Sequence, residues 1–123
     1  MATSGKPVLD MRFDAEPSAP RQARSAVAAR YGEHLRCGDI LVCVSEAVTN
    51  AVLHARTPLR FVVSEVGRRL RIEVTDEDPT LPVVRDPDPG TPTGRGLLLI
   101  DRLSTSWGVE SRADGKTLWF EMT

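Results

Sequence analysis

The chain of 123 residues has little cysteine, almost no net charge and no long apolar segment, and each shortage excludes a class of protein. Its two cysteines, Cys37 and Cys43, are too few and too oddly spaced for a metal cluster or a CxxC redox pair, so we expect buried or half-buried thiols in a reducing compartment. The 16 basic and 17 acidic residues leave a net charge of −1, whereas domains that bind DNA or RNA usually carry a basic excess. We therefore expect no nucleic-acid partner.

The apolar residues are too scattered for a membrane protein. The longest apolar run covers residues 40–44, far short of the roughly 20 residues that a membrane-spanning helix needs. The N-terminal segment lacks the apolar stretch of a secretory signal. We expect a cytoplasmic protein without a membrane anchor, with a flexible N-terminus at 1–7 and a single folded domain at 8–123, because a second core would be too small at this length.

Hydrophobic periodicity predicts hairpins and helices. The predicted strands are 8–13 at a sheet edge, 59–66, 70–75, 107–110 and 117–121. A first helix should start at Ser18, a good N-cap, and end at Gly32; a second should cover 40–55 with Asp39 as its cap; a short buried helix should cover 97–103. Paired strands with grouped helices predict an α+β fold, a two-layer sandwich in which about three helices cover one face of a mostly antiparallel sheet.

The segment 40–55 is the most informative part of the sequence. At about 100° per residue its apolar side chains occupy one broad arc of the helix. Glu46, Asn50 and His54 fall opposite that arc, one turn apart, and such a stripe faces either water or a site. A carboxylate one turn from a carboxamide suits a magnesium–nucleotide site, because an asparagine oxygen can complete a Mg²⁺ octahedron and a glutamate can accept a proton.

Two further segments have residues that a nucleotide site needs. Asp76 ends a strand before a loop that holds five of the nine prolines; it either forms a turn or accepts a hydrogen bond from an exocyclic amine such as that of adenine. Gly94 and Gly96 precede a helix, where free amides and the helix dipole favour phosphate; an ordinary loop is the alternative. Taken together, these segments would surround a nucleotide, with the proline-rich loop as its lid.

The order of these segments resembles that of the Bergerat-fold (GHKL) ATP-binding domains, and within them the small bacterial anti-sigma factor serine kinases. Residues 46–55 (EAVTNAVLHA) are similar to that family's N-box, residues 93–100 (TGRGLLLI) to its second glycine box, and residues 115–120 (GKTLWF) to its closing strand. The resemblance covers nearly the whole chain and implies ATP and Mg²⁺ as cofactors.

The resemblance also implies a role for each matching residue. Glu46 would be the general base and Asn50 the magnesium ligand. Asp76 would accept a hydrogen bond from the adenine amine, with Thr117 near it. The phosphates would be flanked by residues of the second glycine box: Gly94, Arg95, Gly96 and Leu97. The substrate would be a serine on an anti-anti-sigma factor and the second partner a sigma factor, while the oligomeric state, a homodimer included, stays open.

One segment departs from the family pattern. The family's first glycine box reads Asp-x-Gly-x-Gly, whereas residues 76–80 read DEDPT and contain neither glycine. Asp78 adds a Cβ and a negative charge near the expected nucleotide, so we expect weaker ATP affinity or a different lid. The hypotheses are therefore an ATP-dependent serine kinase and a non-catalytic module of the same fold that sequesters a partner. Half of a split histidine kinase is disfavoured, because no helical hairpin with an acceptor histidine is recognisable.

Overall fold

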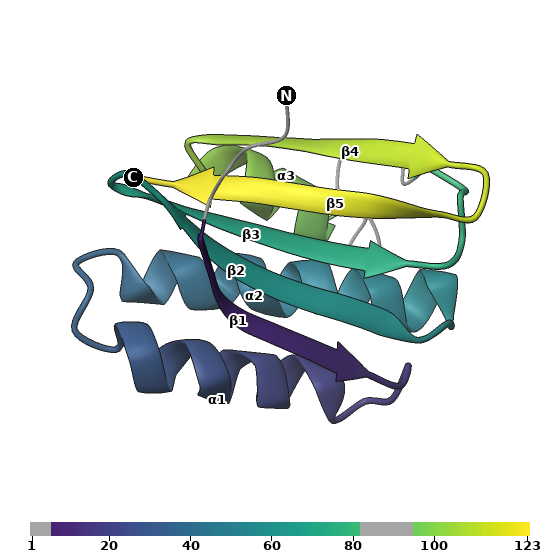
Figure 1. The fold of residues 1–123 in the computed structure, drawn as a ribbon, viewed down its shortest axis with the longest axis horizontal. Helices are drawn as coiled ribbons and strands as arrows, with labels where there is room; N and C mark the ends of the chain where they lie inside the picture. The colour runs from purple at the N-terminus through teal and green to yellow at the C-terminus, as the bar shows by residue number, and fades with distance from the viewer. Residues whose placement is uncertain (1–5, 82–94) are drawn as a thin grey trace.

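The computed structural model describes residues 6–81 and 95–123. Within these residues the elements are, in order, β1 (Lys6–Phe13), α1 (Ala19–Tyr31), α2 (Cys37–Asn50), the π-helical turn η1 (Ala51–Ala55), β2 (Leu59–Val66), β3 (Arg69–Asp76), α3 (Arg95–Leu103), β4 (Ser106–Arg112) and β5 (Gly115–Met122). Figure 1 shows the strands as one twisted sheet with the helices grouped behind it.

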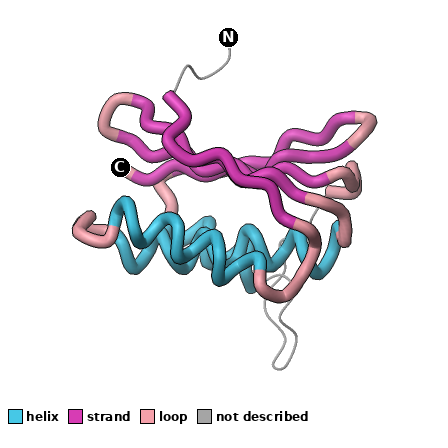
Figure 2. Tube along the Cα trace, turned by 60° about the horizontal axis from the view of Figure 1, so that its bottom comes forward, coloured by secondary structure: helices cyan, strands magenta, loops and turns pink. Residues whose placement is uncertain are grey.

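The five strands of the described chain form an antiparallel sheet in the order β1-β2-β3-β5-β4. β1 is therefore an edge strand, as predicted, and β2 has the predicted bounds. The helices form a separate layer on one face of this sheet, which Figure 2 shows nearly edge-on. The predicted α+β two-layer sandwich is confirmed.

The core lies between the two layers because each strand turns every second side chain toward the helices. Ile72 of β3 and Phe120 of β5 are fully buried there, together with Val44 and Val48 of α2. Helix α2 is the central helix, since both α1 and α3 pack against it. Its core position follows from the broad apolar arc seen in the sequence.

The segment Cys37–Ala55 is long and apolar enough to cross a membrane by length and composition alone, with a mean hydropathy of 1.2. In the structure it is the helix that packs under the sheet, and Ile40 and Ala47 add to its buried side chains. Packing inside the domain thus buries 33% of this apolar window.

Helix α2 differs from the prediction at both ends. Arg36, not Asp39, holds the N-cap position, and Asp39 lies in the first turn with its carboxylate 3.2 Å from the Arg36 guanidinium. An acidic residue is favourable anywhere in the first turn because of the helix dipole, so Asp39 did not mark the boundary. At the other end, the predicted α-helix gives way to the π-helical turn Ala51–Ala55, which Arg56 closes in the left-handed conformation at φ 57°.

The sheet face away from the helices carries charged and aromatic side chains. Arg71 donates a hydrogen bond to Glu121 over 3.1 Å, and its guanidinium lies 4.3 Å from the ring centroid of Trp119. The other tryptophan, Trp107, pairs with a core residue in the sheet and so faces the helices, where its indole N–H donates to Asp101 of α3 over 2.8 Å. The two indoles therefore lie on opposite faces of the sheet.

Candidate functional site

Glu46 of α2 lies directly against Gly96 of α3. A Cβ built on Gly96 would lie 2.9 Å from Oε2 of Glu46 and 3.4 Å from its Cβ, so the end of the glutamate side chain would have to shift to admit it. Helix α3 therefore begins against the glutamate itself. Glu46 is half-buried and takes part in an interaction. The structure thus brings together the first residue of the N-box and the second glycine box.

The start of α3 supplies the glycine-box residues. Gly96 and Leu97 are buried in its first turn, with Leu97 packed in the core. Gly94 lies outside the described residues, and Arg95 is described only as the first residue of the helix. The backbone amides of a first helical turn have no partner inside the helix and carry the positive end of its dipole. A phosphate placed there would lie next to the Glu46 carboxylate.

Asn50 is the last residue of α2, one turn beyond Glu46, and it is half-buried at the junction with the π-helical turn. Such turns are frequent at functional sites. His54, in the same stripe in the sequence, is exposed. Within residues 6–81 and 95–123, no group of three or more His, Cys, Asp and Glu side chains could hold a metal. An asparagine oxygen beside a phosphate site still fits Mg²⁺, which usually takes only one or two protein ligands.

Asp76 ends β3 and its carboxylate forms an ion pair with Lys116 of β5. The ammonium Nζ lies 3.1 Å from Oδ2 and 3.2 Å from Oδ1, and it also donates to the carbonyl of Asp78 over 2.9 Å. Both side chains are buried, with 4% of Asp76 and 10% of Lys116 exposed. A buried carboxylate needs such a partner because an isolated charge is costly to bury. The lysine was not anticipated from the sequence.

Glycine fixes the register that places this lysine beside Asp76. A Cβ on Gly115 would lie 2.1 Å from the carbonyl oxygen of Asp76, so only glycine fits where β5 begins. The next residue, Lys116, then pairs directly with Asp76 and shares its face of the sheet.

Thr117 consequently does not lie where the family resemblance placed it. It pairs with Thr75, so its side chain is on the sheet face opposite the helices and opposite Asp76. Its hydroxyl lies 2.8 Å from the hydroxyl of Thr75 and accepts a hydrogen bond from Arg112 over 2.8 Å. Because strand side chains alternate with period two, a shift of one residue exchanges the faces. Lys116 therefore shares the face of Asp76, and Thr117 does not.

Hydrogen-bonded aspartate turns replace the two glycines that residues 76–80 lack. The backbone N–H of Asp78 donates to Oδ1 of Asp76 over 2.9 Å, and the N–H of Thr80 donates to Oδ1 of Asp78 over 2.9 Å. The hydrogen bond from the Thr80 backbone holds the pKa of Asp78 below its ordinary value. Aspartate stabilises such turns by accepting a hydrogen bond from the backbone two residues further on. The segment after β3 is thus shaped by its own carboxylates.

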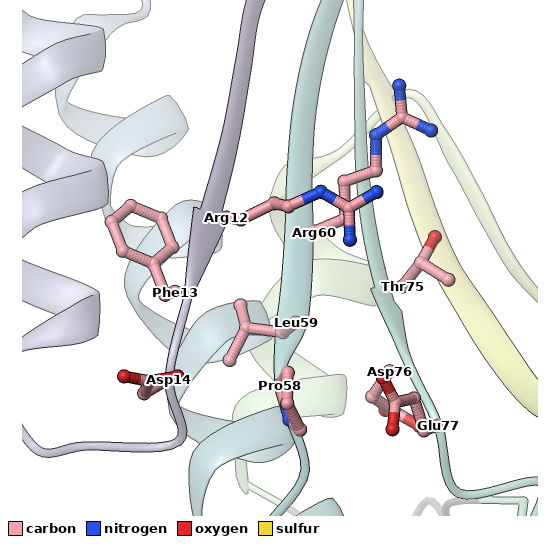
Figure 3. A pocket seen from close by; sticks show the side chains of 9 residues that line it. All are labelled: Arg12, Phe13, Asp14, Pro58, Leu59, Arg60, Thr75, Asp76 and Glu77. Atoms are coloured by element: carbon pink, nitrogen blue, oxygen red, sulfur yellow. The ribbon is translucent and has the colours of Figure 1, made fainter.

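A cavity of about 450 Å³ lies at the ends of β1, β2 and β3. Figure 3 shows the guanidinium groups of Arg12 and Arg60 at one end of it and the acidic Asp14, Asp76 and Glu77 at the other. Among the described residues expected in the nucleotide site, Asp76 alone lines this cavity. The cavity is therefore lined by Asp76 but not by Glu46 or Asn50, and its mixed charge favours neither a cation nor an anion.

The two cysteines offer no nucleophile to the site. Both are free thiols; Cys43 is fully buried and Cys37 half-buried, as expected. Burial raises the pKa of the Cys43 thiol to about 12, so it stays protonated at neutral pH. A thiol in that state packs as a small apolar side chain.

Comparison with known proteins finds a matching family model and a similar sequence. A family model described as a histidine kinase-like ATPase domain matches residues 13–122. An uncharacterised protein of Streptomyces coelicolor is 38% identical over 82 residues, which cover 61% of this chain and 76% of that protein.

Two solved structures share the fold at low sequence identity. The RsbU and RsbW domains of a Mycobacterium tuberculosis protein superpose with a TM-score of 0.68 at 20% identity, over 94% of this chain and 32% of that one. The histidine kinase domain of a blue-light activated histidine kinase from Erythrobacter litoralis superposes with a TM-score of 0.56 at 20% identity, over 84% of this chain and 58% of that one. The chain thus spans about a third of the first structure, and both likenesses concern the fold alone.

Proposed function

The chain belongs to the histidine kinase-like ATPase domain family, and from this premise we propose that it is an ATP-dependent serine kinase of the anti-sigma factor type. Its protein substrate would be an anti-anti-sigma factor, its second partner a sigma factor, and its place of action the cytoplasm. The RsbW domain in one of its structural neighbours supports this choice among the kinase-like domains. The observation that carries the proposal is the contact between Glu46 and Gly96.

That contact supports a base at the point of phosphate transfer. Amides at the start of α3 would hold the terminal phosphates, and the Glu46 carboxylate lies against the same turn. A serine hydroxyl entering between them would have its proton within reach of the carboxylate. The carboxylate would accept this proton as the serine oxygen attacks the γ-phosphorus, whose bond to the bridging oxygen breaks and releases ADP. Helix α2, packed in the core, keeps the glutamate in place during this step.

Asn50 and Asp76 would hold the two ends of the nucleotide. The carboxamide oxygen of Asn50 is the protein ligand that we assign to Mg²⁺, which when bound neutralises phosphate charge. The carboxylate of Asp76, buried at the end of β3, would accept a hydrogen bond from the adenine amine. Leu97, together with Gly96, would lie beside the phosphates.

The test is phosphate transfer from radiolabelled ATP in the presence of Mg²⁺. The acceptor is the anti-anti-sigma protein that the full chain captures from native lysate with ATP present. Glu46→Gln keeps the size of the side chain but removes the base, and we expect transfer to fall by about 10²- to 10⁴-fold. Glu33→Gln, at an exposed glutamate, is the matched control and should retain full transfer. Undiminished transfer by Glu46→Gln would exclude the assigned base.

A second function is favoured by the segment that follows β3. Aspartate turns stand where the family has glycines, and Lys116 holds the Asp76 carboxylate. A module of this kind would sequester its partner without phosphate transfer. Calorimetric titration with ATP and Mg²⁺ separates the two functions, because the kinase needs saturable binding of ATP. Capture of a sigma factor that does not change with ATP, together with no heat of binding, would favour the sequestering module.

A further inference from the structure

The geometry points to Lys116 as the residue that selects the base of the nucleotide, together with Asp76. The pair would read the Watson–Crick edge of a 6-aminopurine, with Asp76 accepting from the exocyclic amine and Lys116 donating to the ring nitrogen N1. This inference rests on the proposed ATP-binding function. It assigns a direct, charged contact with the base to Lys116, the neighbour of the Thr117 that the family resemblance places near Asp76.

The pair has one hydrogen-bond acceptor and one donor that no other described residue uses. Oδ1 of Asp76 already accepts from the Asp78 backbone and from Lys116, which fills its two acceptor positions. Oδ2 accepts from Lys116 alone among the described residues and retains one acceptor position. The ammonium lies at nearly equal distances, 3.1 and 3.2 Å, from the two oxygens, as when one N–H is shared between them. A second N–H goes to the Asp78 carbonyl, and a third has no partner among the described residues.

The free acceptor and the free donor are adjacent, because Oδ2 and Nζ are 3.1 Å apart. Adenine presents a donor at N6 next to an acceptor at N1, which is the complementary pattern. In the same pose a 6-oxopurine such as guanine or hypoxanthine opposes its carbonyl to Oδ2 and its N1–H to the ammonium, so both contacts are lost. A polar group left unpaired in a buried site is costly, and this asymmetry gives strong discrimination.

The surrounding strands hold both groups of the pair in place. Asp76 is fixed by the turn that follows β3, and Lys116 by its pairing with Asp76 next to Gly115. Preorganised donors and acceptors bind a ligand without the entropic cost of ordering a side chain. The pair therefore acts as a rigid template for the base, whereas a threonine on the opposite face of β5 has no access to it.

The experiment measures the affinity of the full chain for nucleotides by calorimetry in the presence of Mg²⁺. The wild-type chain is titrated with ATP, with 1-deaza-ATP, in which a carbon replaces N1, and with 7-deaza-ATP as a control. We expect 1-deaza-ATP to bind at least about tenfold more weakly than ATP, and 7-deaza-ATP to bind like ATP, because only the first lacks the acceptor for Lys116. ITP should be weaker than ATP by a larger factor. These comparisons need no mutation, so they do not depend on how a variant folds.

The second arm uses Lys116→Met, which keeps the length of the side chain but removes the donor. We expect this variant to bind ATP as weakly as the wild type binds 1-deaza-ATP, and to lose the difference between the two nucleotides. Lys6→Met, at the exposed start of β1, is the matched control and should bind as the wild type does.

Each alternative result has a distinct meaning. Equal binding of ATP and 1-deaza-ATP by the wild type would overturn the role of Lys116 while leaving the ATP-binding function intact. Tighter binding of ATP by Lys116→Met would also overturn it, because the lysine would then obstruct Asp76. Failure of the wild type to bind any of these nucleotides would refute the proposed function. It would also refute the recognition of the base by Asp76 and Lys116.

Discussion

Replacing Gly96 by alanine tests whether the position of the Glu46 carboxylate matters for function. The added methyl group would begin 2.9 Å from Oε2 of Glu46, where ordinary contact between carbon and oxygen is about 3.4 Å or more. The carboxylate must therefore move by several tenths of an ångström. It can do so because it is the end of a flexible side chain, whereas the Cβ of Glu46, 3.4 Å from the new methyl, is fixed by the backbone.

The energetic consequences for stability and for activity differ. Turning a side chain away from its preferred rotamer costs about 0.5–1.5 kcal/mol, and the better helix propensity of alanine offsets up to about 1 kcal/mol. We therefore expect the melting temperature of Gly96→Ala to stay within about 4 °C of the wild type. A displaced base lowers phosphate transfer far more, by about 10- to 100-fold, because transfer depends on the position of the reacting groups.

The assay pairs thermal unfolding with initial rates of phosphate transfer, and Gly38→Ala is the control. Gly38 is also near the start of a helix, but a Cβ there would meet no atom within 4 Å. It should leave both quantities unchanged. Full transfer by Gly96→Ala would refute the reasoning, since the carboxylate would then be moved without effect. Loss of transfer only in step with a large loss of stability would equally refute it.

Two further predictions concern the framework of the site. Gly115→Ala places a Cβ 2.1 Å from the backbone oxygen of Asp76, which cannot rotate away, so we expect urea unfolding to show a loss of about 2–4 kcal/mol; a loss under about 0.5 kcal/mol would contradict this register. The second concerns pH: burial raises the pKa of Cys43 from 9.0 to about 12, so above pH 9.0 the unfolded chain loses a proton that the folded chain keeps. Above pH 9.0 the free energy of unfolding of the wild type should therefore fall with pH more steeply than that of Cys43→Ala, by up to about 1.4 kcal/mol per pH unit. Parallel pH profiles of the two proteins would argue against the raised pKa of Cys43.

The strands and helices, and their order along the chain, could be predicted because their sequence signals are local. The alternating residues of β2 predict a strand, and a glycine directly after it favours a tight turn; Gly67 adopts φ 61° there. Long-range evidence was not needed for the burial of Val44 and Val48 either, since the apolar arc of α2 specifies which side faces the core.

The details of the site depended on features with weak sequence signals. The π-helical turn after Asn50 consists of residues that suit an α-helix equally well, so none of them predicts the change of helix type. The face on which Thr117 lies depends on where β5 begins, and the clash that forces Gly115 beside Asp76 arises only once two distant strands are paired. Lys116 acquires its partner through the same pairing. The signal that could have placed Lys116 is the alternation of side chains along residues 115–122, counted from Gly115.

The placement of the two tryptophans gives this small molecule a separate optical reporter for each layer. A chain that retains only Trp107 emits from an indole tied to Asp101, so its spectrum follows movements of α3, the helix that begins with the glycine-box residues. A chain that retains only Trp119 emits from beneath the Arg71 guanidinium and follows the opposite surface of the sheet. Motion of α3 and changes at the outer face of the sheet can thus be timed independently in solution.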